Sequence, residues 1–289
     1  MLSMGGQIKL RNLRQPRWLN PVEAMFASLI LGTGLLEAVV FLLGVAQGNV
    51  PISFKIIGAL YFVLPYVLLQ TRIRVTSGAS WWSLRRWNFL VFTLNVLFLT
   101  VLLWYGTAGA NGILAVIIAA GLLYNAPKIH FRTVPVLDVL CVITYVSGPF
   151  LYGVFVAGNS GSWWIAGWLT GCVVAAAHYF MRKLPAVGLE ARGRLDGTVV
   201  RLGMDRSISI ALGLYIAALF LPIIGYGWHG VPVSVALLWY VVIALQAVPL
   251  RLVAGTTGLQ KVWRAIWFVS YPITALILAY AAVALAHIP

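Results

Sequence analysis

Residues 182–203 read RKLPAVGLEARGRLDGTVVRLG and lie between two apolar segments, 162–181 and 207–227. Each flanking segment is about 20 residues long, the length that a helix needs to cross the hydrocarbon core of a bilayer. The stretch between them holds more basic than acidic residues, which is typical of a loop on the cytoplasmic side of a membrane. The stretch therefore predicts a cytoplasmic loop between two transmembrane helices.

The composition extends this prediction to the whole chain. Of the 289 residues, 62% are hydrophobic and 9% are charged, whereas a soluble domain carries about 25% charged residues. Each apolar segment should be helical, because lipid does not tolerate unpaired backbone polar groups. The fold class expected is an all-α integral membrane protein, with one domain of nine transmembrane helices over residues 1–289 and a short basic cytoplasmic arm at 1–20. The expected spans are 23–46, 52–70, 88–105, 108–125, 135–157, 162–181, 207–227, 231–250 and 265–287.

The distribution of charge predicts the orientation. The formal net charge is +14, and every Lys and Arg except Lys55 falls in the N-terminal arm or in alternate loops between the expected spans. This asymmetry predicts a cytoplasmic N-terminus and a C-terminus on the outer side. The basic face also favours contact with anionic membrane lipids. Nucleic acid is excluded as a partner, since no soluble basic domain is present.

Three stretches at the ends of the expected spans carry a family resemblance. They are RQPRWLNPVEAMFASLILGTG at residues 14–34, YNAPKIHFRTVPVLDVL at residues 124–140, and residues 182–203. In this order they resemble the UbiA family of membrane prenyltransferases, and most nearly its lycopene elongase branch. His130 and Arg132 stand where that family has Arg and Lys. The residues of the second stretch that are identical to the family pattern are Tyr124, Pro127, Pro135, Leu137 and Asp138.

The resemblance implies a chemistry for which this sequence lacks groups. Family members hold Mg²⁺ with two Asp-rich motifs and transfer a prenyl group from its diphosphate to an acceptor. Here Ala186 and Glu190 occupy the two Asp positions of the second motif. The loop expected to carry the first motif, QTRIRVTSGASWWSLRR, contains Arg72 and Arg74 but no acid. Because Mg²⁺ is held mainly by carboxylate oxygens, we expect no metal site, and Mg²⁺ as a cofactor only if the protein is an active enzyme.

Each candidate at the cytoplasmic face has two interpretations. Glu190 is a remaining metal ligand or, as we favour, the partner of Arg194 at i,i+4 spacing. A group of basic residues forms a metal-free site for a phosphate or other anionic head group, or it only sets the topology. The residues of this group are Arg72, Arg74, Lys128, His130, Arg132, Arg192 and Arg194.

Four further residues stand out by their positions. Tyr124 and Asp138 bracket the loop that closes the cavity mouth in the family. Alternatively, Tyr124 anchors the membrane interface and Asp138 caps the helix that follows, which we favour for Asp138. Glu37 lies deep in the first span, where a charge is costly. It either pairs with Lys55 or is protonated and hydrogen-bonded within the bundle.

The missing carboxylates favour a non-catalytic function. We expect a protein that binds an isoprenoid, a carotenoid or another lipid, or that serves as an accessory subunit of an active homologue or a larger membrane complex. The alternative is an active prenyltransferase that holds the diphosphate with Arg and Lys. A transporter is disfavoured, because the chain shows no clear internal repeat and few ionisable residues inside its spans.

Overall fold

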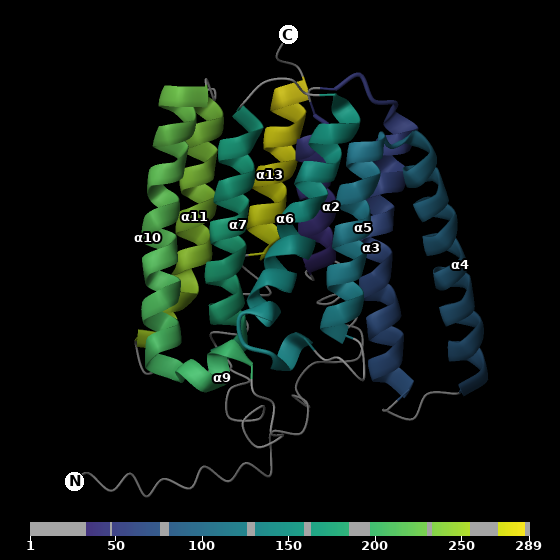
Figure 1. The fold of residues 1–289 in the computed structure, drawn as a ribbon, viewed down its shortest axis with the longest axis horizontal. Helices are drawn as coiled ribbons and strands as arrows, with labels where there is room; N and C mark the ends of the chain where they lie inside the picture. Colours follow the sequence, from purple (N-terminus) through teal and green to yellow (C-terminus); the bar gives the residue numbers. More distant parts are fainter. Residues whose placement is uncertain are drawn as a thin grey trace, which may run out of the picture.

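The computed structural model describes residues 33–46, 48–75, 81–125, 131–158, 163–184, 197–229, 233–254 and 271–286. Within these ranges the chain forms ten α-helices, drawn in Figure 1, and one 3₁₀ turn, η2 (Phe131–Thr133). Each of the nine longer helices lies in one expected span or extends it, which confirms the all-α prediction. The helices are α2 (Thr33–Gly44), α3 (Ile52–Val75), α4 (Trp81–Tyr105), α5 (Ala108–Asn125), α6 (Leu137–Ala157), α7 (Trp163–Lys183), α9 (Thr198–Leu202), α10 (Met204–His229), α11 (Val233–Ala254) and α13 (Tyr271–Ala286).

The apolar content of the helices fits a membrane. Three of the described helices are long and apolar enough to cross a bilayer, and five more carry shorter apolar stretches. Several helices continue past the expected spans into polar sequence; α3, for example, ends at Val75 and includes Arg72 and Arg74. Long basic side chains at a helix end can reach the membrane surface along their own stems, so a helix can extend beyond its apolar segment. The five-residue helix α9, inside the 182–203 stretch, was not predicted.

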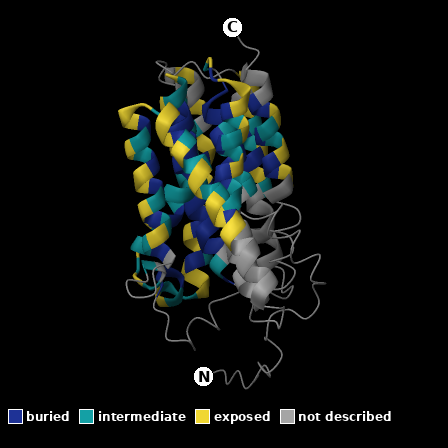
Figure 2. Cartoon of the chain, turned by 90° about the vertical axis from the view of Figure 1, so that its right-hand side faces the viewer, coloured by how far each residue is buried: buried dark blue, intermediate teal, exposed yellow. Residues whose placement is uncertain are grey.

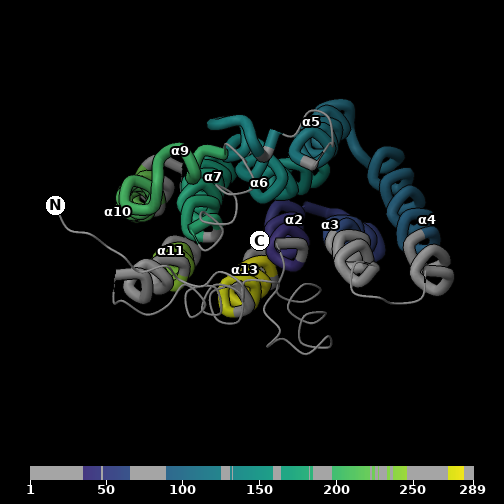
Figure 3. The backbone as a smooth tube through the Cα atoms, turned by 90° about the horizontal axis from the view of Figure 1, so that it is seen from below, coloured from purple at the N-terminus to yellow at the C-terminus, as the bar shows by residue number. Residues whose placement is uncertain are grey.

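The helices stand side by side in one bundle. Seen from below, α2 lies in the middle, with α3, α6 and α13 packed against it (Figure 3). Helix α7 lies between α6 and α10, and α4 lies at one edge against α3. Helix α9 lies at the lower end in Figure 1, which is called the α9 end below.

The contact between α2 and α6 is held close by two glycines. A Cβ atom on Gly44 would lie 2.3 Å from the carbonyl oxygen of Phe150, and one on Gly153 would lie 2.7 Å from that of Phe41. Small residues allow helix backbones to approach in a membrane. Large apolar side chains such as Phe89 and Trp104 are exposed, and exposed residues follow the outer faces of the helices in Figure 2. This surface suits contact with lipid.

Candidate functional site

A buried carboxylate joins three helices at the α9 end. Asp138, in the first turn of α6, is fully buried. One of its oxygens accepts hydrogen bonds from the Tyr179 hydroxyl of α7 and from the backbone N–H of Thr198 in α9, the latter at 2.9 Å. The other oxygen accepts from the Thr198 hydroxyl and, at 2.9 Å, from the N–H of Val139. We call Asp138, Thr198 and Tyr179 the clasp.

The clasp also holds the segment before α6. The backbone N–H of Val136 donates to the Thr198 hydroxyl oxygen at 2.7 Å. Val136 is the residue that precedes α6, with φ 72° and ψ −46°, a strained backbone conformation for a β-branched residue. The N-cap position of α6 is Val136, not Asp138. Asp138 does accept one N–H of its own first turn, that of Val139, and its other hydrogen bonds join α6 to α7 and α9.

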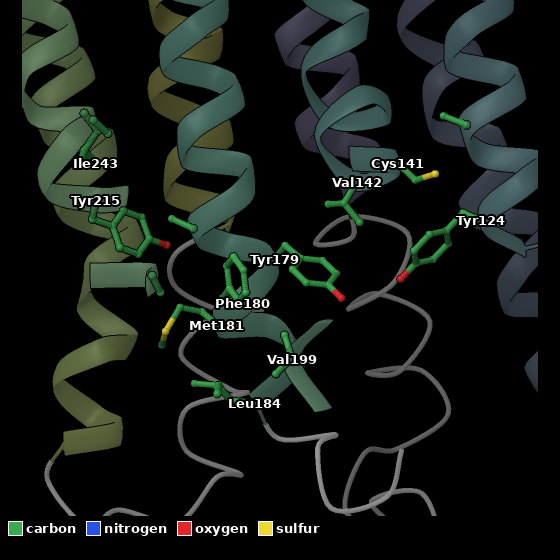
Figure 4. Close-up of a cluster of buried hydrophobic side chains, with 14 residues drawn as sticks. Tyr124, Cys141, Val142, Tyr179, Phe180, Met181, Leu184, Val199, Tyr215 and Ile243 are labelled. Atoms are coloured by element: carbon green, nitrogen blue, oxygen red, sulfur yellow. The ribbon is translucent and has the colours of Figure 1, made fainter. Parts of the chain in front are cut away.

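The clasp brings two of the three motif stretches together. Asp138 belongs to residues 124–140 and Thr198 to residues 182–203. The two residues are 60 positions apart in the sequence. Tyr124, at the start of residues 124–140, is also buried, and its ring packs edge-on against Tyr145 at 6.0 Å. Figure 4 shows the Tyr124 and Tyr179 hydroxyls directed toward the space between their helices. Tyr124 thus lies in the same buried apolar cluster as Tyr179.

A cavity extends from the clasp between five helices. Its volume is about 110 Å³. On α7 it runs from Gly167 to Tyr179, about 18 Å at 1.5 Å per residue. Its described lining comprises Leu36, Val40, Leu43, Val142, Val146, Ser147, Phe150, Gly167, Trp168, Thr170, Gly171, Val174, Ala175, His178, Tyr179, Trp239, Val242, Ile243, Thr274 and Leu278.

Three hydroxyl groups of this lining are hydrogen-bonded to the protein, whereas the Trp168 indole N–H is buried without a hydrogen-bond partner among the described residues. The hydroxyls of Ser147 and Thr170 donate to the carbonyl oxygens of their own helices, each at 2.7 Å. The Tyr179 hydroxyl donates to Asp138. No Asp, Glu, Lys or Arg occurs among the described lining residues. The cavity therefore suits a long apolar molecule.

The described residues do not provide a magnesium site. Among them no group of three or more His, Cys, Asp or Glu side chains comes together. Asp138 already accepts four hydrogen bonds, and Asp205 is exposed on α10. Mg²⁺ requires several free oxygen ligands in octahedral geometry. Ala186 and Glu190, the positions of the degenerate motif, lie outside the described residues.

The structure places Glu37 near Tyr61. Glu37 is buried on α2, and its carboxyl group acts electrostatically on Tyr61 of α3. Lys55 lies in the first turn of α3, six positions or about 9 Å of helix before Tyr61. Phe41, one turn after Glu37, packs against Gly58 and Phe54. Along the contact between α2 and α3, Lys55 is therefore level with Phe41 or past it, on the side away from Glu37. Tyr61 is thus one neighbour of Glu37, and the pair with Lys55 remains a prediction.

Most of the proposed anion-binding residues cannot be placed. The backbones of Arg72 and Arg74 lie in the last turn of α3, and that of Arg132 lies in η2. Lys128, His130, Arg192 and Arg194 lie outside the described residues. Three described cationic residues stand at or beside α9: Lys183 is half-buried, and Arg201 and Arg206 are exposed. The predicted anion site therefore remains a prediction.

Three residues of the site were missed by sequence reasoning. Thr198 and Tyr179 complete the clasp, and His178, which is buried, lines the cavity beside Tyr179. His178 was visible as an ionisable residue inside an apolar span, which marks a candidate functional position. Thr198 gave no such signal, because a Thr in a polar loop is common.

Comparisons with known proteins identify the fold. No protein-family model matches the sequence, and no curated protein matches it. The structure is similar to that of a UbiA homolog from Archaeoglobus fulgidus bound to GPP and Mg²⁺, with a TM-score of 0.70 and 15% sequence identity. The same homolog bound to DMAPP and Mg²⁺ gives a TM-score of 0.69 and 15% identity. A structure of digeranylgeranylglyceryl phosphate synthase gives a TM-score of 0.59 and 11% identity. Each match covers 92% of this chain and 100% of the other.

The class of protein follows from the fold and the cavity. The chain is an all-helical, multi-pass membrane protein with an apolar cavity. Its fold is UbiA-like, and it is structurally similar to UbiA prenyltransferase homologues over 92% of its length. The resemblance noted in the sequence is thus confirmed for the fold.

Proposed function

We propose that the protein binds a neutral or weakly polar isoprenoid-like lipid in this cavity and does not catalyse Mg²⁺-dependent prenyl transfer. The main support is the chemistry of the described lining, which is apolar and contains no carboxylate. The carboxylate next to it, Asp138, already accepts four hydrogen bonds, from α7, α9 and its own helix α6. Van der Waals packing and shape would select the ligand, since an isoprenoid tail gains little on leaving equally apolar lipid.

The lycopene elongase-like branch suggests the kind of ligand. Members of that branch act on carotenoids, so a carotenoid or a related long isoprenoid is the first ligand to seek. The N-terminus would be cytoplasmic, and the basic α9 end would face anionic lipid head groups. The protein would act alone as a binding protein or as an accessory subunit beside an active homologue.

The alternative is an active prenyltransferase. It is favoured by the fold similarity to a homolog that was solved with GPP and with DMAPP. In that case Arg and Lys residues at the α9 end would stabilise the leaving diphosphate in place of a metal. Such an enzyme would turn over without a divalent cation.

Extraction of the native ligand tests the binding proposal. The protein would be purified from its own membranes in lipid nanodiscs, and the isoprenoids and pigments in the particle quantified by mass spectrometry. Empty nanodiscs formed from the same lipid extract are the control. The proposal expects one isoprenoid class enriched toward one molecule per protein. An isoprenoid profile identical to that of the empty nanodiscs would remove the binding function.

A further inference from the structure

The further inference concerns Tyr179, which belongs to the cavity and to the clasp. Its side chain lines the cavity, and its hydroxyl donates to Asp138 on the adjacent helix. The ring is almost fully buried and packs edge-on against Phe180 at 5.5 Å. The position of this part of the cavity wall therefore depends on where Asp138 is held.

Thr198 supplies two of the four hydrogen bonds that Asp138 accepts. The backbone N–H and the hydroxyl of Thr198 donate to different oxygens of the carboxylate, which fixes its plane. Thr198 is the first residue of α9, and the following residue, Val199, is buried in the same cluster as Tyr179. Thr198, which follows the degenerate second motif in the sequence, is thus hydrogen-bonded to Asp138, the carboxylate that positions the cavity wall.

The Thr198 hydroxyl also holds residues 124–140, through Val136. Its oxygen accepts from the backbone N–H of Val136 while its proton goes to Asp138. Ser could make both contacts, because it carries the same hydroxyl, whereas Val has the shape of Thr without the donor and acceptor. A loss of this hydroxyl would release Val136 and loosen Asp138 together.

We propose that Thr198 is a positioning residue for the ligand: through Asp138 it fixes Tyr179 in the cavity wall, and so sets the fit of an isoprenoid at the α9 end. This inference rests on the proposed function, since it takes the cavity to be the ligand site. Beyond that function, Thr198, which does not line the cavity, would control how much ligand the cavity binds. A role in stability alone would lower the melting temperature without changing occupancy below it.

The two native cysteines provide a readout that needs no ligand. Cys141 is buried in the cluster of Tyr124 and Tyr179 at the α9 end, whereas Cys172 lies beside Ser147 farther along the bundle. Loosening of the clasp should expose Cys141 and leave Cys172 unchanged. A membrane-permeant maleimide, followed by peptide mass spectrometry, measures both rates in one sample.

The experiment compares three variants in nanodiscs. Thr198→Val removes the hydroxyl, and Thr198→Ser restores it. Tyr152→Phe is the matched control, because Tyr152 is also fully buried and donates one hydrogen bond, to the Leu102 carbonyl at 2.9 Å, outside the cavity lining. The probe is deuterated geranylgeraniol, an isoprenoid alcohol, quantified on the protein by native mass spectrometry well below the melting temperature.

We expect Thr198→Val to lower the affinity for the probe about three- to tenfold, the ratio that corresponds to one hydrogen bond of ordinary strength. It should also speed labelling of Cys141 several-fold, and Thr198→Ser should reverse both effects. Tyr152→Phe should lower the melting temperature without changing either readout. Unchanged affinity in Thr198→Val, or an equal loss in Tyr152→Phe, would overturn the positioning role and leave the binding function intact. Absence of probe binding by the wild type would instead remove the binding function itself.

Discussion

Gly44 of α2 and Gly153 of α6 face each other so closely that a Cβ atom added to Gly153 would lie 3.1 Å from the Cα atom of Gly44. Helix α2 is central to the bundle and contributes to the cavity wall through Leu36, Val40 and Leu43. The distance between α2 and α6 therefore sets the width of the cavity as well as the packing of the core.

Alanine at Gly44 should destabilise the bundle. The new Cβ would lie 2.3 Å from the Phe150 carbonyl oxygen, a backbone atom that cannot move without α6. Overpacking of this kind costs about 1–3 kcal/mol. The measurement is the free energy of unfolding in mixed micelles titrated with denaturing detergent. Gly213→Ala on α10 is the control: its Cβ would meet open space, so helix propensity should make it neutral or up to about 1 kcal/mol stabilising. Equal effects of the two substitutions would contradict the close α2–α6 contact.

Glycine at position 136 should not destabilise the protein, although it removes a Val. Val136 has φ 72° and an exposed side chain, so glycine relieves strain while losing little packing. The expected change is between zero and about 1 kcal/mol of added stability. At Val134, which has no positive φ, glycine should cost about 0.4–1 kcal/mol through the entropy of the unfolded chain. A loss at 136 as large as that at 134 would show that Val136 is not strained.

A double-mutant cycle should couple Glu37 to Tyr61 and not to Lys55. The Glu37 carboxyl group acts on Tyr61 across the α2–α3 contact. We expect a coupling of about 0.5–2 kcal/mol between Glu37→Gln and Tyr61→Phe. The cycle of Glu37→Gln with Lys55→Gln should give less than about 0.5 kcal/mol. A larger coupling to Lys55 would instead support the ion pair suggested by the sequence.

Cysteine labelling tests the orientation. In a background without Cys141 and Cys172, Gly78→Cys between α3 and α4 should react only from the cytoplasmic side. Ser160→Cys between α6 and α7 should react only from the outer side. The reason is the confinement of every Lys and Arg except Lys55 to the N-terminal arm and alternate loops. Reaction of both positions from one side would rule out the expected number of spans.

The helical framework could be predicted because membrane spans have a strong local signal. An apolar run of about 20 residues between basic loops identifies a helix without knowledge of its neighbours. The motif spacing around Tyr124 and Asp138 then predicted the UbiA-like arrangement. Helix ends were less accurate, as α3 shows by continuing through Arg72 and Arg74.

The clasp could not be predicted, because it depends on contacts between residues far apart in the sequence. Asp138 was recognised as a candidate site residue, but a carboxylate at the start of a helix is equally typical of a residue that only stabilises the helix end. Its partner Thr198 lies 60 positions away, and no local pattern links the two. Glu37 shows the same limit, since its burial was expected but its neighbour Tyr61 was not.

The most direct test of the proposed function is the fate of a prenyl diphosphate. Purified protein in nanodiscs made from its native lipid extract would be incubated with geranyl diphosphate and Mg²⁺, with and without EDTA. Released pyrophosphate reports transfer to any acceptor in the extract, or hydrolysis. The account predicts no release above that from empty nanodiscs, because the described residues provide no cluster of carboxylates to hold the metal. Release that persists in EDTA would favour the enzyme that uses Arg and Lys, and release that EDTA abolishes would contradict the account.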